Sequence, residues 1–248
     1  MYSIQYLKRL MFFDLETTAE EKSLKNLKKK DPPKAAAFQY NYDMAVSRNR
    51  VPWIDKTVDE MYVDQAALLP EYGKIICMSW GFLEIQEGQE IKCKIGSFIG
   101  DEKELLQKAQ KLFVTLGEKN HIPCGQNIKN FDLPYLSKRM VINELEVPSI
   151  LCTAGKKPWE ILAEDTKEAW SFGNRSNQSN LVETCAALKI PTPKDDIWGG
   201  EVFNVFWKDK DIDRIATYCE KDVLAVMNIM LKLSGNPIIK KKINKPHY

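Results

Sequence analysis

RLMFFDLETT, residues 9–18, is an apolar run that ends in two acids with one residue between them. The run over residues 10–15 predicts a β-strand, in which successive side chains alternate between the two faces. Asp14 and Glu16 therefore point to one side of the strand, and Leu15 points to the other. Two neighbouring carboxylates repel each other, and one of them tends to have its pKa raised. A further group must therefore hold the two acids together.

The length and composition of the chain are those of an ordinary soluble protein. Its 248 residues fit one large α/β domain with insertions, and 44% hydrophobic with 28% charged residues is typical of a globular fold. The net charge of +2 does not by itself indicate a nucleic-acid partner. No apolar run has the length of a membrane span, and the N-terminus lacks the pattern of a secretory signal. We therefore expect no membrane association and a cytoplasmic location.

The six cysteines are scattered along the chain without a CxxC pair. This distribution predicts reduced, mostly buried thiols of a cytoplasmic protein, rather than a zinc site or a disulfide framework. Only two histidines are present, which limits the available chemistry, because histidine is the usual general base near neutral pH.

The pattern of apolar residues predicts strands and helices around a lysine-rich insertion. Residues 19–72 have no sustained strand pattern, and their prolines and polar residues indicate short helices and loops between two strands. We expect one domain over residues 1–248, with this insertion and a loosely held basic tail at residues 238–248. Further strands are expected at residues 73–85, 90–99 and 121–127, and helices at residues 101–116, 132–145, 181–189 and 211–233.

Three more polar side chains lie on the expected helices. Asp132 lies where one helix begins, and Tyr218 and Asp222 lie four residues apart on the last helix, hence on one face of it. Each has an ordinary structural explanation when it is taken alone. Asp132 is a preferred N-cap residue, a helical aspartate is usually solvated, and a buried tyrosine usually packs. Only the set of acids taken together favours a functional interpretation.

The order of these residues resembles the three exonuclease motifs of the DEDD superfamily of 3′–5′ exonucleases, in its tyrosine branch. The motif D-x-E is present as FDLET, N-x(2,3)-F-D as NIKNFD, and Y-x(3)-D as YCEKD. The similarity to the proofreading exonuclease domain of family B DNA polymerases extends from residue 12 to about residue 231. A sister branch has a histidine five residues before its last aspartate, where this chain has Thr217. The segment PTPKDDIWGG resembles one found in stand-alone phage and bacterial relatives, but it suggests no role for Lys194, Asp195 or Asp196.

The resemblance implies a ribonuclease H-like α/β fold, in which a central mixed β-sheet is flanked by helices on both faces. It also implies a metal-dependent exonuclease that hydrolyses phosphodiester bonds from the 3′ end of single-stranded DNA and releases nucleoside 5′-monophosphates. Oxygen ligands suit hard ions, so the expected cofactors are two divalent cations, Mg²⁺ or Mn²⁺, whose charge offsets the repulsion in the acid pair. Single-stranded DNA is the expected partner, preferred over RNA, and replication or repair proteins are further candidates.

The same resemblance implies a role for each acid of the site and for the tyrosine. Asp14 is expected to bridge both ions. Glu16 and Asp222 are expected to bind the ion nearer the attacking water, and Asp132 to bind the second ion. Tyr218 is expected to orient this water rather than to act as a base, because the pKa of free tyrosine is near 10.

Four residues are expected to contact the 3′ end of the substrate. Asn127 and Phe131 resemble residues that contact the terminal nucleotides, the amide by hydrogen bonds and the ring by stacking. Leu15 and Thr17 lie beside the catalytic acids. Phe131 has an equally good explanation as a core residue.

Three alternatives remain open. DLETT loosely resembles the D-x-D-x-T signature of aspartate-nucleophile phosphatases, but Glu16 replaces the second aspartate and no accompanying lysine is evident. The tyrosine branch also contains RNA-trimming exoribonucleases of the ribonuclease D type, and no residue here distinguishes the 2′-hydroxyl group of RNA. A catalytically silent single-strand-binding module would have lost a metal ligand, whereas all four acids and the tyrosine are present.

Overall fold

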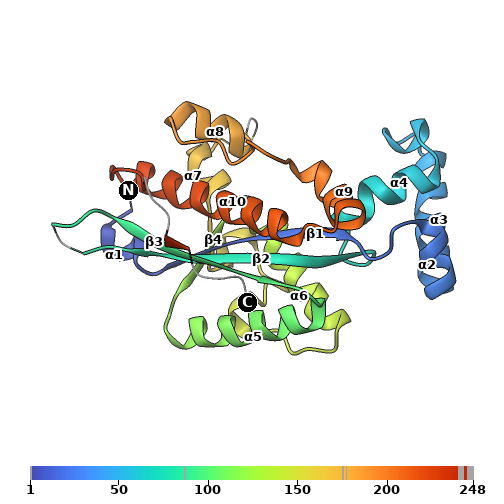
Figure 1. Cartoon of the computed structure of the whole chain (residues 1–248), viewed down its shortest axis with the longest axis horizontal. Coiled ribbons are helices and arrows are strands. Elements are labelled where there is room, and N and C mark those ends of the chain that lie inside the picture. The colour runs from blue at the N-terminus through green and yellow to red at the C-terminus, as the bar shows by residue number, and fades with distance from the viewer. Residues whose placement is uncertain (1, 87, 175, 177, 240–242, 245–248) are drawn as a thin grey trace.

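The apolar run near the N-terminus forms an inner strand of a mixed β-sheet. A computed structural model describes residues 2–86, 88–174, 176, 178–239 and 243–244 of the chain. In this part the strands are β1 (Leu10–Ala19), β2 (Gly73–Glu84), β3 (Lys92–Ile99), β4 (Ile122–Gly125), β5 (Glu164–Asp165) and β6 (Ile243–Asn244). They lie in the order β5-β4-β1-β2-β3-β6 (Figure 1). β2 pairs antiparallel with β1 and β3, whereas the other neighbours pair in parallel.

Helices occupy most of the connections between these strands. The α-helices are α1 (Ile4–Leu7), α2 (Leu24–Lys30), α3 (Pro32–Ser47), α4 (Val58–Gln65), α5 (Glu102–Glu118), α6 (Asp132–Ile142), α7 (Thr166–Ser171), α8 (Leu181–Leu188), α9 (Val202–Asn204) and α10 (Ile212–Leu233). The single helical turns are η1 (Trp53–Asp55), η2 (Ala66–Leu68), η3 (Ser149–Leu151), η4 (Pro158–Glu160), η5 (Gly199–Glu201) and η6 (Val205–Asp209), of which η6 is π-helical.

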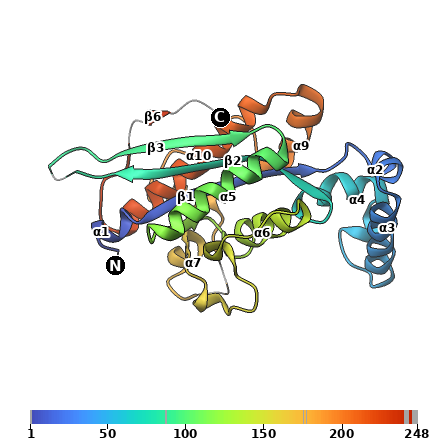
Figure 2. The ribbon, with the colours of Figure 1, turned by 90° about the horizontal axis from the view of Figure 1, so that it is seen from below.

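Helices cover both faces of the sheet, as the two ribbon views show (Figures 1 and 2). α10 lies along one face and contacts β1, β2 and β3, whereas α5 packs against β2 and β3 on the other face. Leu10 and Phe12 of β1 belong to the same apolar cluster as residues of α10. Phe13 points the other way, and its ring meets the ring of Phe113 on α5 edge-on at 5.2 Å between centroids. The alternation expected of β1 and the predicted mixed α/β sheet are confirmed.

β1 is longer than the apolar run that predicted it. The strand was expected to end at residue 15, and it continues to Ala19, paired with the first residues of β2. The register shifts between Glu16, which faces Cys77, and Thr17, which faces Ile75, so β2 has one extra residue at this point. Such a bulge increases the local twist and changes where the neighbouring side chains point. The strand end was wrongly placed because pairing with β2, rather than hydrophobicity, determines it.

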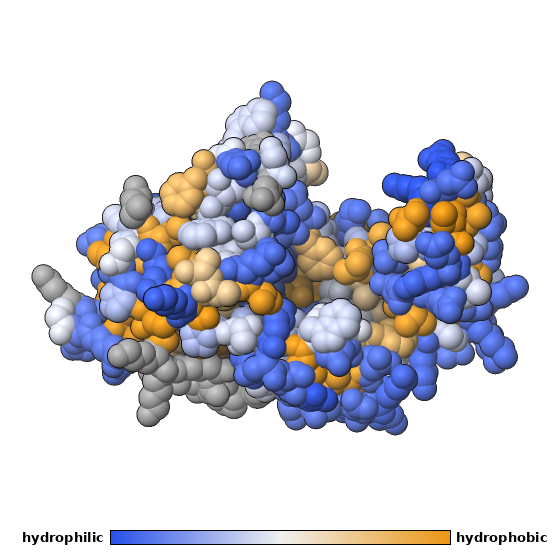
Figure 3. Space-filling model, turned by 90° about the horizontal axis from the view of Figure 1, so that it is seen from above, coloured by the Kyte–Doolittle hydropathy of each residue, from blue (hydrophilic) through white to orange (hydrophobic). Residues whose placement is uncertain are grey.

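The segment between β1 and β2 forms a helical lobe, α2–α4, at one end of the sheet (Figure 1). The lobe has its own apolar cluster, in which the ring of Phe38 meets the rings of Tyr62 and Tyr72 edge-on. Lys34 of α3 forms an ion pair with Glu20, which directly follows β1, at 2.7 Å. Figure 3 shows the surface hollowed between this lobe and the main body. The hollow lies toward the end of β1 that follows the acid pair.

A buried ion pair fixes α6 to α5 and β2. Arg139 of α6 is 3% exposed, and its Nε donates to Oε1 of Glu102, the first residue of α5, at 2.8 Å. The same carboxylate oxygen accepts the backbone N–H of Ile75 at 2.7 Å, and Nη1 of Arg139 donates to the backbone oxygen of Pro70 at 2.8 Å. Because α6 begins at Asp132, these contacts also determine where that acid lies.

Other expectations from the sequence have mixed outcomes. The strands expected at residues 73–85 and 90–99 are present as β2 and β3, and the helix expected at residues 211–233 is present as α10. Cys152 is exposed and the other five cysteines are buried, as predicted, and all six are free thiols. None of the helices in the described part of the chain has the length and hydropathy of a membrane span. The predicted loose tail at residues 238–248 lies largely outside the described residues.

Candidate active site

Four carboxylates from three distant segments converge beside β1. Asp14 and Glu16 lie on β1, Asp132 is the first residue of α6, and Asp222 lies on α10. The backbone N–H of Leu15 donates to Oδ1 of Asp132 at 3.1 Å, which ties the start of α6 to β1. The charges of Asp222 and Asp132 both act on the carboxyl group of Asp14. The structure therefore brings together all four acids that the motifs indicated.

Each acid is placed by the local structure of its own segment. Alternation along β1 puts Asp14 and Glu16 on the face that α10 covers, together with Phe12. α10 begins after Asp211, whose side chain caps the helix by accepting the N–H of Arg214 at 3.0 Å. From this start, helical periodicity puts the tyrosine and the aspartate of the third motif on one face, one turn apart.

Burial makes this group of carboxylates unfavourable without added positive charge. Glu16, Asp132 and Asp222 are 8%, 3% and 5% exposed. Burial raises the pKa of Asp14 and of Glu16 well above the usual range, and neighbouring carboxylates raise both further. Burial also raises the pKa of Asp132 to about 8, although hydrogen bonds from backbone N–H groups act in the opposite direction. Burial and mutual repulsion therefore disfavour the charged forms of these acids unless cations offset their charge.

Lys194 supplies one positive charge to the acids, a role that no sequence pattern indicated. Its Nζ donates to Oδ2 of Asp222 at 2.9 Å and to the hydroxyl group of Tyr218. It also lies 4.1 Å from the centre of the Tyr218 ring. Burial raises the pKa of Asp222, and the charge of Lys194 lowers it. The tyrosine and the aspartate of the third motif therefore share one cation.

Ion pairs of the next two residues fasten the Lys194 loop to α10. Asp195 accepts from Lys221 at 2.5 Å, and Asp196 accepts two hydrogen bonds from Arg214 at 2.7 and 2.8 Å. Both partners lie on α10, Arg214 one turn before the third motif and Lys221 within it. The segment PTPKDD has no apolar period that could have indicated these contacts, because they join a loop to a helix that comes later in the chain.

Replacing Lys194 by methionine should destabilise the metal-free protein by about 1–3 kcal/mol, because Asp222 then loses a charged hydrogen-bond partner. Thermal or urea unfolding in EDTA would measure this loss. Saturating Mn²⁺ should reduce the difference from the wild type, because bound cations would replace the missing charge. Lys221→Met breaks an exposed ion pair with Asp195 of the same loop and should lower the stability by less than about 1 kcal/mol. Equal losses for Lys194→Met with and without Mn²⁺ would contradict this explanation.

Asp165 holds the loop of the second motif, and it is 2% exposed. Its carboxylate accepts the backbone N–H groups of Asn127 at 2.9 Å, Lys129 at 3.3 Å and Lys167 at 3.0 Å. Asn127 has a φ of 58°, in the left-handed region that few residues adopt. Asp165 thus caps α7 and supports this turn at the same time. Its role in the described structure is to position the second motif.

Replacing Asp165 by alanine should cost about 1–3 kcal/mol of stability, since three backbone donors then lose a buried acceptor. The loosened turn carries Asn127, which the resemblance places at the 3′ end of the substrate, so the KM for a nucleic-acid strand should rise more than kcat falls. Glu168→Ala on the same helix removes only a partly exposed ion pair with Lys129 and should change both properties little. Urea unfolding and steady-state digestion would measure the two effects. An Asp165→Ala variant as stable as Glu168→Ala would refute this assignment.

The four residues expected at the 3′ end of the substrate lie in different settings. The side chain of Leu15 is 5% exposed and packs in the core, so its backbone rather than its side chain faces the site. The hydroxyl group of Thr17 donates to a backbone oxygen of η2 at 2.7 Å. Phe131 packs partly in the core, with its ring 5.2 Å from that of Tyr135. Asn127 lies in the turn held by the buried carboxylate of β5.

The acids fit divalent cations. Oδ1 of Asp222 is buried and has no hydrogen-bond partner among the described residues, which is costly unless a ligand occupies the position. Carboxylate oxygens are the ligands that Mg²⁺ and Mn²⁺ prefer. One potential ligand was missed: Sγ of Cys219 and oxygens of Asp14 and Glu16 lie within 4.8 Å of one another. Cys219 precedes Asp222 by three residues, and this helical spacing could have indicated it.

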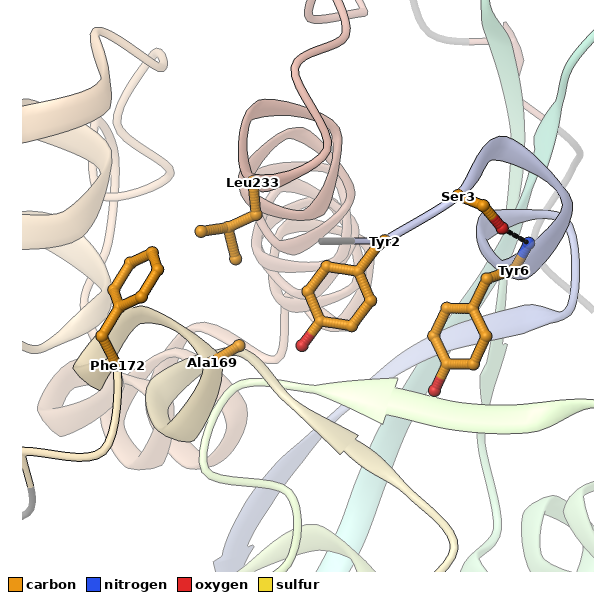
Figure 4. A pocket seen from close by; sticks show the side chains of 6 residues that line it. All are labelled: Tyr2, Ser3, Tyr6, Ala169, Phe172 and Leu233. Carbon is orange, nitrogen blue, oxygen red and sulfur yellow. Dashed lines mark hydrogen bonds between the residues drawn. The ribbon is translucent and has the colours of Figure 1, made fainter.

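A large apolar pocket lies elsewhere, between α1, α7 and the end of α10. Its volume is about 660 Å³, and Tyr2, Tyr6 and Phe172 are among the residues that line it (Figure 4). The hydroxyl groups of Tyr2 and Tyr6 both donate to Glu164. None of the acids of the motifs lines this pocket, so the clustered carboxylates and not this hollow define the candidate site.

A mixed sheet with helices on both faces and carboxylates clustered beside an inner strand is characteristic of ribonuclease H-like α/β proteins. Residues 69–236 match the family described as predicted 3′–5′ exonucleases related to the exonuclease domain of PolB. The match covers more than half of the chain, and the chain belongs to this family. Exonuclease domains of this kind use divalent metals and act on nucleic acid. A search of the curated proteins found no match.

The family match covers only part of the candidate site. It includes Asp132, Tyr218 and Asp222, and it begins well after Asp14 and Glu16. The pairing of β1 with β2 and β4 places the unmatched acid pair beside the matched segment. The fold therefore brings the first motif close to the other two.

Proposed function

We propose that this protein is a metal-dependent 3′–5′ exonuclease that hydrolyses phosphodiester bonds from the 3′ end of single-stranded DNA. The products would be nucleoside 5′-monophosphates. The observation that carries this proposal is the convergence of the four acids around a buried carboxylate oxygen of Asp222 that has no partner in the described part of the chain. Residues 1–248 would act as one exonuclease domain, with an insertion at about residues 19–72.

The acids would hold two divalent cations, Mg²⁺ or Mn²⁺. Such a pair of ions supplies the positive charge that stabilises the attacking and leaving oxygens of phosphodiester hydrolysis. We assign Asp14 to both ions. Glu16 and Asp222 are assigned to one ion and Asp132 to the other, as the motifs of the family suggest. Positive charge at this position would also relieve the mutual repulsion that raises the pKa of the acid pair.

Tyr218 would position the attacking water instead of accepting its proton. Its side chain is 4% exposed, and its hydroxyl group is held by Lys194, which is itself bonded to Asp222. A hydroxyl group held by an ammonium group is poorly suited to act as a base, whereas it can accept or donate a hydrogen bond in a fixed direction. Loss of this hydroxyl should therefore slow the reaction less than loss of a carboxylate.

The 3′ end of the strand would lie against the first and second motifs. Oδ1 of Asn127 accepts from Asn130, and its Nδ2 would donate to the strand, whereas Phe131 would stack on a base, a contact that tolerates any sequence. Leu15 and Thr17 border the acids from β1. The preference for DNA over RNA rests on the similarity of the second motif to that of the PolB relatives.

Digestion of end-labelled strands tests this function. Single-stranded DNA with a 5′ label should give a ladder of shortening products with Mg²⁺ or Mn²⁺, and a 3′ label should be released at once as a mononucleotide. EDTA and the Asp222→Asn substitution should each stop the reaction. An RNA strand of the same sequence, digested in parallel, distinguishes the two sugars. Faster digestion of RNA would replace the proposed substrate by RNA, and binding without any cleavage would indicate a silent single-strand-binding module.

A further inference from the structure

Cys219 lies inside the cluster of acids. Its Sγ donates to Oδ2 of Asp14 at 3.4 Å and to the backbone oxygen of the same residue at 3.3 Å. The side chain is fully buried, and its sulfur lies within 4.8 Å of carboxylate oxygens of both Asp14 and Glu16. The thiol is thus close enough to bind the same metal ion as the hard oxygen donors of the site.

The separation between sulfur and oxygen suits two ligands of one soft ion. Zinc–sulfur bonds are about 2.3 Å long and zinc–oxygen bonds about 2.0 Å, so tetrahedral sulfur and oxygen ligands lie about 3.5 Å apart. The distance of 3.4 Å between Sγ of Cys219 and Oδ2 of Asp14 is close to this value. Little movement of either side chain is needed for both to bind the same ion.

A second observation points to a ligand within the cluster of acids, where the charge of Asp222 acts on both Asp14 and Glu16. Asp222 is 5% exposed and lies one helical turn after Cys219, and its Oδ1 has no partner among the residues that the structure describes. Its other oxygen is occupied by Lys194. A buried oxygen without a partner costs free energy unless a cation, a proton or a water molecule satisfies it.

We propose that Asp14, Glu16 and Cys219 form a binding site for thiophilic divalent cations of the Zn²⁺ type within the acid cluster. This inference rests on the proposed function and adds a metal selectivity to it. A thiophilic ion bound there would compete with Mg²⁺ or Mn²⁺ for Asp14. The protein would therefore be inhibited by Zn²⁺ at concentrations at which a site of carboxylates alone would still bind the hard ion.

Whether Cys219 binds the metal ion or donates a hydrogen bond to Asp14 depends on the hardness of the ion. Binding of a soft ion forms a sulfur–metal bond, and the proton of the thiol is released to the solvent. When no soft ion is bound, the buried thiol donates its hydrogen bond to Asp14. Mg²⁺ has little affinity for sulfur, and with this ion Cys219 would continue to donate its hydrogen bond to Asp14.

Titration with Cd²⁺ tests the site by a signal that does not depend on catalysis. The full chain, stripped of metal with a chelator that is then removed, would be titrated with Cd²⁺ while the ultraviolet charge-transfer absorbance of the sulfur–cadmium bond is recorded. Every sample carries Cys152→Ser, because Cys152 is the exposed thiol among the six. We expect a band that saturates at one equivalent of Cd²⁺. Adding Cys219→Ser should abolish the band and weaken Cd²⁺ binding about tenfold or more.

Cys185→Ser in the same background is the matched control. Its thiol is also buried, and the negative charge of Asp222 acts on it. The band should persist in this variant. Its loss there, or an unchanged band in the Cys219→Ser variant, would overturn the proposal. Should circular dichroism show that Cys219→Ser is unfolded, Glu16→Gln leaves the thiol in place and should still weaken Cd²⁺ binding; unchanged affinity would then overturn the proposal.

Digestion of labelled DNA with Mg²⁺, by the same Cys152→Ser preparation, separates this inference from the proposed function. A normal cadmium band without digestion would remove the nuclease assignment and leave the metal site. Digestion without a cadmium band would remove the proposed metal site and leave the nuclease assignment.

Discussion

Asp14→Asn should abolish hydrolysis and at the same time raise the melting temperature of the metal-free protein. The acid is expected to contact both cations, and loss of several kcal/mol of charge stabilisation corresponds to about a 10³-fold slower reaction or more. Without metal, the same carboxylate is desolvated and repelled by Asp222 and Asp132. Removing its charge should therefore stabilise the metal-free fold by about 1 kcal/mol, since groups kept for function are often held at a cost in stability.

Steady-state digestion of a labelled strand and thermal unfolding in EDTA would measure the two effects of Asp14→Asn. Asp43→Asn, at an exposed position on α3, is the control and should change neither property. A variant that loses activity and also melts earlier in EDTA would show that Asp14 is needed mainly for the fold. A loss of activity together with a higher melting temperature distinguishes a metal ligand from a structural acid.

The metal-free protein should lose stability as the pH rises, contrary to the usual behaviour of proteins whose carboxylates are paired. The pKa of Asp132 is raised from 3.8 to about 8, so the folded state binds this proton more tightly than the unfolded state does. The stabilisation that comes from this proton is then fully present below pH 4, and it is lost as the pH rises toward about 8. A shift of this size corresponds to a loss on the order of 5 kcal/mol.

Urea unfolding in EDTA, at about pH 5 and about pH 8.5, would measure this loss. Saturating Mn²⁺ should remove most of it, because cations bind the deprotonated acids and stabilise the folded state by mass action. The Asp132→Asn variant should show a smaller dependence on pH in EDTA, and the part that remains comes from the other buried acids, whose pKa values are also raised. Stability that rises with pH in the metal-free wild type would refute the explanation from buried, unpaired acids.

Much of the fold follows from patterns within single elements. The alternation in residues 10–15 indicated β1 and correctly put Asp14 and Glu16 on one face. Helical spacing indicated α10 and put Tyr218 and Asp222 one turn apart. The end of β1 did not follow from such a pattern, because Glu16 and the three residues after it extend the strand by pairing with β2.

The sequence by itself determined the main strands and helices, the face shared by Asp14 and Glu16, the face shared by Tyr218 and Asp222, and the family to which the chain belongs, because periodicity and motif spacing are local properties of the chain. Only the tertiary structure showed that Asp222 and Tyr218 share Lys194, that Asp165 holds the turn of the second motif, and that Cys219 lies against Asp14. These contacts join elements that are far apart in the sequence. Their geometry depends on how the helices pack against the sheet, and no spacing along the chain encodes that packing.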